Sequence, residues 1–68
     1  MDKLIEELRG KDPVTDIVIK EYESRGELLR LNISEDDESR YRHHVAALGV
    51  LLRKIAREQY GLEWTKFQ

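Results

Sequence analysis

The sequence predicts a mainly α-helical fold: a short N-terminal helix, then a helical hairpin that ends in one long helix over residues 35–60. Apolar residues recur at helical spacing, and capping residues stand at the ends of each segment. Charge is also unevenly distributed. Residues 1–39 hold six basic and twelve acidic side chains, or −6, whereas residues 40–68 hold six basic and two acidic ones, or +4. Opposite charges favour antiparallel packing of the two parts, within one chain or between neighbours.

The first segment, residues 2–9, is predicted to be a short helix. Leu4, Ile5 and Leu8 fall at helical spacing, and Gly10 is well placed to end the helix. Because so short a helix is marginal by itself, we expect it to pack on the rest of the chain.

The second segment starts with Asp12 as N-cap and Pro13 at the first helical position. A helix keeps its apolar residues on one broad side: Val14, Ile17, Val18, Tyr22, Leu28 and Leu29. The alternative is an α+β fold with a β-hairpin at residues 14–33 packed on the long helix. Residues 17–19 are β-branched and residues 24–26 fit a three-residue turn with glycine in the left-handed position. We favour the helix because of its Asp-Pro start.

The long helix has the strongest signals. Ser34 is its predicted N-cap, with Asp37 completing a loose capping box, and Gly61 its stop, with Leu62 folding back on the last turn. Acidic residues gather in the first turn and basic residues towards the end, as the helix dipole favours. A heptad-like seam is predicted along it: Tyr41, Val45, Leu48, Leu52, Ile55, Gln59 and Leu62. We expect Leu48 and Leu52 in the core, and Trp64 and Phe67 packed rather than exposed.

The length of this helix predicts self-association. Its 26 residues span about 39 Å, whereas a compact globule of 68 residues is only about 28 Å across. Residues 45–52 are also apolar nearly all the way round, more than the N-terminal part can cover. We therefore predict a homo-oligomer, most simply a two-fold dimer in a helical bundle. The candidate interface residues are Ala46, Gly49, Val50 and Leu51.

Composition points to one small domain, residues 1–68, without a cofactor. The chain has no cysteine, which excludes disulfides and thiolate zinc sites, and its two histidines are too few for a structural zinc site. The longest apolar run, residues 45–52, is too short to cross a bilayer. The acidic, amphipathic N-terminus does not resemble a signal peptide. We expect a soluble, cytoplasmic protein that does not insert into membranes.

A basic face of the long helix is the candidate contact for nucleic acid or another anion: Arg42, His43, Arg53, Lys54 and Arg57. Such side chains can neutralise phosphates. The competing interpretation, which we favour, is a solvated face that pairs with the acidic N-terminal part. Ala46 and Val50 interrupt the stripe, and the sequence contains no recognised DNA- or RNA-binding motif.

His44 lies near the predicted seam and is a candidate phospho-acceptor, although a boundary histidine is the commoner case. The sequence offers no Ser/His/Asp arrangement, Gly-rich phosphate loop, or carboxylate within an apolar run. We therefore predict a small non-enzymatic protein that acts in protein–protein interaction or regulation as a helical homo-oligomer. A nucleic-acid-binding regulator is the first alternative, and a His phosphotransfer protein the second.

Overall fold

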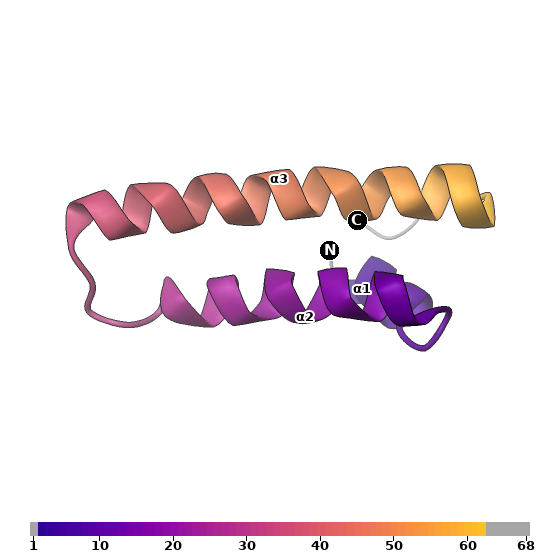
Figure 1. Ribbon diagram of the computed structural model, residues 1–68, viewed down its shortest axis with the longest axis horizontal. Helices are drawn as coiled ribbons and strands as arrows, with labels where there is room; N and C mark the ends of the chain where they lie inside the picture. Colours follow the sequence, from indigo (N-terminus) through magenta and orange to yellow (C-terminus); the bar gives the residue numbers. More distant parts are fainter. Residues whose placement is uncertain (1, 63–68) are drawn as a thin grey trace.

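The computed structural model describes residues 2–62, which form three α-helices: α1 (Asp2–Leu8), α2 (Pro13–Leu28) and α3 (Glu35–Tyr60). The helices α2 and α3 run antiparallel along the long axis of the molecule (Figure 1). The short α1 lies against one end of this pair, beside the start of α2 and the end of α3 (Figure 1). The prediction of a mainly α-helical fold with a helical hairpin is confirmed.

The helix α2 is continuous through residues 17–19 and 24–26, so the β-hairpin alternative for residues 14–33 is wrong. Its start explains why: the side chain of Asp12 accepts a hydrogen bond from the Thr15 amide at 2.8 Å, with Pro13 following as predicted. Once this end is capped, the β-branched run at residues 17–19 costs little, because Ile19 is buried in the core.

The helix α3 covers residues 35–60, as predicted from its caps. Ser34 accepts a hydrogen bond from the Asp37 amide at 3.2 Å. At the other end Gly61 has the left-handed conformation, with φ of 65°, and the Leu62 amide donates to the Ala56 carbonyl at 2.8 Å. Leu62 thereby folds back onto the core, as predicted.

The core is small and lies where all three helices meet. Its buried apolar residues are Leu4, Ile5, Leu8, Ile19, Leu52 and Ala56. The predicted seam of α3 is correct at Leu52, which is buried. At other positions the buried side of the helix differs from the prediction. Gly49 and Ala56 are buried instead, whereas Leu48 is only half-buried and Gln59 is exposed. Small residues lie at the centre because they let neighbouring helices approach closely. The predictions for Trp64 and Phe67 lie outside the described residues.

The molecule is a thin slab rather than a sphere. Its extents are 38 × 23 × 16 Å, and its radius of gyration is 12.6 Å. A compact chain of this length is expected to have a radius of gyration of about 11 Å. No helix in residues 2–62 is long and apolar enough to cross a membrane.

The first prediction concerns the core. Leu52→Ala should lower the free energy of unfolding by about 2–5 kcal/mol, because it removes a fully buried side chain from a small core. Leu31→Ala is the matched control, since Leu31 is 60% exposed and its truncation should cost less than about 0.5 kcal/mol. Urea unfolding of both variants measures the difference. Equal stabilities would show that Leu52 is misplaced.

The second prediction compares two glycines whose missing side chains would both meet open space. Gly26→Ala should stabilise the protein by up to about 1 kcal/mol, because Gly26 lies within α2 and no atom lies within 4 Å of the added carbon. Gly10→Ala should destabilise it by about 1 kcal/mol, because Gly10 has φ of 82°. Thermal unfolding distinguishes them. Changes in melting temperature of the same sign for both variants would contradict a helical conformation at Gly26 and a left-handed one at Gly10.

Candidate functional site

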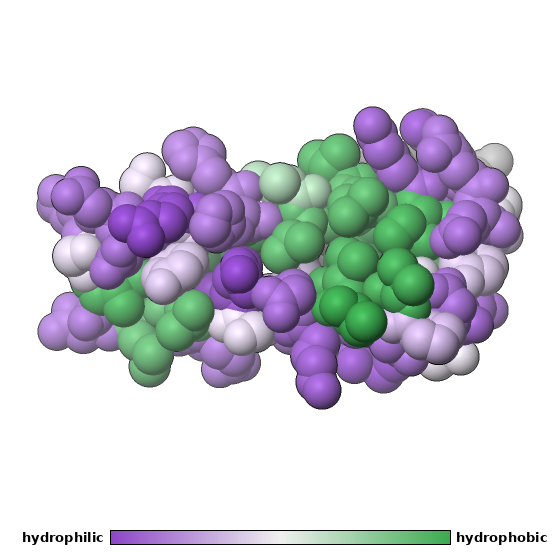
Figure 2. Space-filling model, viewed as in Figure 1, coloured by the Kyte–Doolittle hydropathy of each residue, from purple (hydrophilic) through white to green (hydrophobic). Residues whose placement is uncertain are grey.

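Within the part of the chain that the structure describes, α2 and α3 have one broad surface that no other helix covers, on the side away from α1. Exposed apolar side chains lie on both helices, with Val14 68% exposed on α2 and Leu51 43% exposed on α3. Figure 2 shows hydrophobic surface gathered over both helices on the face turned to the viewer. In Figure 1, drawn from the same side, α1 is fainter and therefore lies behind the pair. Hydrophobic surface of this kind is typical of a protein-interaction site.

We call this surface the open face. It consists of a stripe on α2 (Val14, Val18, Glu21 and Arg25) and a stripe on α3 (His44, Ala47, Leu48 and Leu51). In the α2 stripe each residue lies three or four positions after the one before it, so all four residues share one side of the helix. The α3 stripe has the same spacing, except that Ala47 and Leu48 are adjacent and make the stripe wider there. A shallow groove of about 260 Å³ runs between the stripes and is lined by Glu21, Arg25, His44, Ala47 and Leu48. No residue of α1 lines it.

The open face is largely uncharged overall. Glu21 and Arg25 form an ion pair one helical turn apart, so their charges offset each other. His44 is exposed, and its ring lies edge to face with that of Tyr41, at 6.3 Å between centroids. The apolar residues between these groups therefore dominate what a partner would meet.

The structure separates the predicted interface residues. Ala46, Val50 and Leu51 are exposed, and Val50 and Leu51 each lie within one turn of Ala47 on the open face. Gly49 is instead buried within the chain and is not available to a partner. The sequence pattern missed this because α3 is apolar nearly all the way round at residues 45–52, so periodicity alone did not identify the inward side.

The predicted basic face is spread over a wide arc of α3. Arg42 is held by Glu38 at 2.6 Å, and Arg53 is half-buried. His43, Lys54 and Arg57 are exposed, but Arg53 and Lys54, as neighbours, point about 100° apart. Anion binding by these residues stays a hypothesis. Within residues 2–62 no three His, Asp or Glu side chains are grouped so that they could hold a metal ion.

Sequence reasoning missed one polar cluster that ties the end of α3 to the start of α2. Tyr60 donates a hydrogen bond to Asp12 Oδ2, which also accepts one from the fully buried Thr15 hydroxyl at 2.7 Å. The ammonium of Lys11 lies 5.8 Å from the centre of the Tyr60 ring. Asp12 was recognised only as an N-cap, because a partner 48 residues away leaves no local signal.

The hydrogen bond between Tyr60 and Asp12 shifts the pKa values of both groups. The Tyr60 hydrogen bond, with those from Thr15, lowers the pKa of Asp12 below its ordinary value. The same bond to a carboxylate raises the pKa of Tyr60 above its ordinary value. The hydrogen bonds of this cluster hold the start of α2 and the end of α3 together.

Comparison with known proteins found no relative. The chain matches no protein-family model, and no match was found among the curated proteins or the solved structures. The function is therefore inferred from the surfaces of the molecule.

The third prediction follows from the Asp12–Tyr60 bond. Asp12 stabilises the fold above about pH 4 and loses this effect as the pH falls towards its lowered pKa. Tyr60 stabilises it below about pH 10 and loses this effect as the pH rises through its raised pKa. Tyr60→Phe should therefore be less stable than wild type at neutral pH, and the difference should shrink at both extremes.

Thermal unfolding of wild type and Tyr60→Phe across this pH range provides the measurement. Tyr41→Phe is the control, because Tyr41 contacts His44 through its ring, which phenylalanine retains. A stability difference that is the same at every pH would mean that Tyr60 contributes packing only.

Proposed function

We propose that this protein is a non-enzymatic interaction protein that works as a two-fold homodimer, joined through the open face. The observation that carries the proposal is the apolar surface that α2 and α3 share at one end of the pair (Figure 2), where Val14 and Leu51 are exposed on opposite helices. Leaving such surface in water is unfavourable by about 25 cal/mol per Å², and a second copy presents an identical apolar surface to cover it.

The dimensions of the molecule leave room for a second copy as the occupant. The broad side of the slab measures 38 × 23 Å, which is large enough for an interface in which each partner buries about 800 Å². Stacking two copies across their 16 Å thickness doubles that dimension to about 32 Å. The dimer would then approach the compact shape that one chain lacks.

The charge of the open face permits the same arrangement. A two-fold axis can set each α2 against the α3 of the other copy. Glu21 and Arg25 form an ion pair on this face, so two copies would not bring unpaired like charges together there. The result is a four-helix layer in which both helical hairpins cover each other.

The fourth prediction tests this interface from both of its helices. Leu51→Glu and Val14→Glu should each convert the dimer to a monomer, because they place a charge without a partner in the buried contact. Sedimentation equilibrium of the wild type should give about twice the chain mass of 8.1 kDa, and each variant about 8.1 kDa. The melting temperature of the wild type should also rise with protein concentration.

Leu31→Glu is the matched control, because Leu31 is 60% exposed but lies in the connection between α2 and α3, outside the open face. It should remain dimeric. Circular dichroism should show that all three variants keep their helices, since every substituted position is at least 43% exposed. A wild-type chain that sediments at 8.1 kDa across the micromolar range would refute the proposal.

A further inference from the structure

The third helix of the bundle is much shorter than the pair that it covers. With seven residues, α1 is about 11 Å long, whereas α2 with sixteen is about 24 Å long. On the side of the molecule where α1 packs, about 13 Å of α2 and of the facing part of α3 therefore have no third helix from residues 2–62 over them. This stretch begins at the N-terminus of α1 and extends towards the connection between α2 and α3 (Figure 1).

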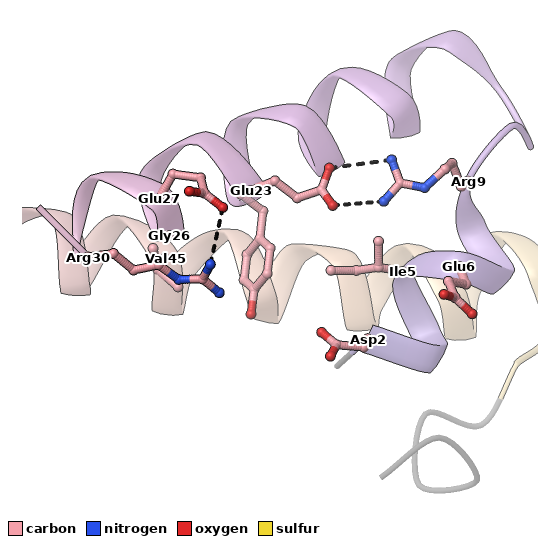
Figure 3. A pocket seen from close by; sticks show the side chains of 10 residues that line it. Asp2, Ile5, Glu6, Arg9, Glu23, Gly26, Glu27, Arg30 and Val45 are labelled. Atoms are coloured by element: carbon pink, nitrogen blue, oxygen red, sulfur yellow. Dashed lines mark hydrogen bonds and ion pairs between the residues drawn. The ribbon is translucent and has the colours of Figure 1, made fainter.

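A groove of about 420 Å³ lies on this side of the molecule, distinct from the open face. It runs beside α1, from Arg9 to Asp2, and continues to Arg30 and Val45. Its apolar lining comes from all three helices: Ile5 of α1, Tyr22 and Gly26 of α2, and Val45 of α3. Gly26 widens it, because no atom lies within 4 Å of where its side chain would begin. Figure 3 shows Ile5 and Val45 along the groove, with charged side chains on either side of them.

The rim of the groove is acidic. Its charged residues are Asp2, Glu6, Glu23, Glu27, Arg9 and Arg30, which sum to −2. Both arginines are already engaged: Arg9 makes a two-pronged contact with Glu23 at 2.8 and 3.3 Å, and Arg30 contacts Glu27 at 3.4 Å (Figure 3). Among residues 2–62 neither Asp2 nor Glu6 forms an ion pair, although Glu6 contributes to the raised pKa of Arg9 through its charge. Both carboxylates therefore remain accessible to a cationic partner.

We propose that this groove binds a cationic, amphipathic helix of a partner protein, seated beside α1 and over the stretch of α2 and α3 that α1 leaves open. The open length of about 13 Å accommodates about nine helical residues. Apolar side chains spaced three or four apart would contact Tyr22 and Val45, since helices recognise grooves through such spacing. Lysine or arginine beside them would meet Asp2 and Glu6.

The experiment uses a defined probe: a 16-residue peptide with blocked ends, leucine at every third or fourth position, lysine beside the leucines and alanine elsewhere. Titrated into ¹⁵N-labelled protein, it should shift the amide resonances of Tyr22, Gly26 and Val45. The same peptide with glutamate in place of lysine should show no binding, because the groove carries −2.

Two neighbouring charge reversals provide the matched comparison. Glu6→Lys should weaken peptide binding about tenfold, since it replaces an attraction at the rim by a repulsion. Glu7→Lys makes the same change of charge on the same helix, but Glu7 does not line the groove, so affinity should change less than about twofold. Both positions are exposed, so both variants should fold.

Four results would overturn the proposal. They are no shifts with the lysine peptide at millimolar concentration, shifts centred on Val14 and Leu51 instead, equal binding of the glutamate peptide, and equal weakening by Glu6→Lys and Glu7→Lys. The test is independent of self-association. A monomeric protein that binds the peptide in this groove would refute the homodimer only, and a dimer that does not bind it would refute the groove only.

Discussion

The antiparallel pair of α2 and α3 has two broad sides, and within residues 2–62 a helix of only seven residues, α1, is left to cover them. This shortage of covering surface is the constraint on which the rest of the structure depends. The six buried apolar residues all lie on α1 or on the halves of α2 and α3 that α1 contacts. Away from α1 the pair is only one helical layer thick, and its apolar side chains are partly exposed.

Contacts between the helix ends add to the stability that this small core provides. Asp12 caps α2 and accepts hydrogen bonds from Thr15. It also accepts one from Tyr60, which lies at the end of α3. Gly61 and Leu62 then turn the chain back onto the core. These contacts all lie at the end of the molecule where α1 packs, so that end has the densest network of interactions. The opposite end has Leu31 exposed and surface ion pairs such as Arg30 with Glu27, which contribute little to stability.

The open face and the groove beside α1 differ in chemistry, and we therefore propose a different partner for each. The open face is apolar, broad and nearly neutral, as suits an identical surface of another copy. The groove beside α1 is narrow, and the charged residues of its rim sum to −2, which favours a cationic segment. Because the surfaces lie on opposite sides of the helical pair, a dimer would keep both of its grooves accessible.

Local signals in the sequence determined the three helices and most of their ends. Asp12, Ser34 and Gly61 act on backbone groups within a few residues, so caps and stops are visible without any knowledge of the fold. The tertiary structure decided which side of each helix is inside. Val45, Gly49 and Leu52 differ little from Leu48 and Leu51 in pattern, and only the positions of α1 and α2 select Gly49, Leu52 and Ala56 for burial. The Asp12–Tyr60 bond and the groove likewise join residues from separate helices. Such contacts depend on how helices pack, which periodicity along one helix does not specify.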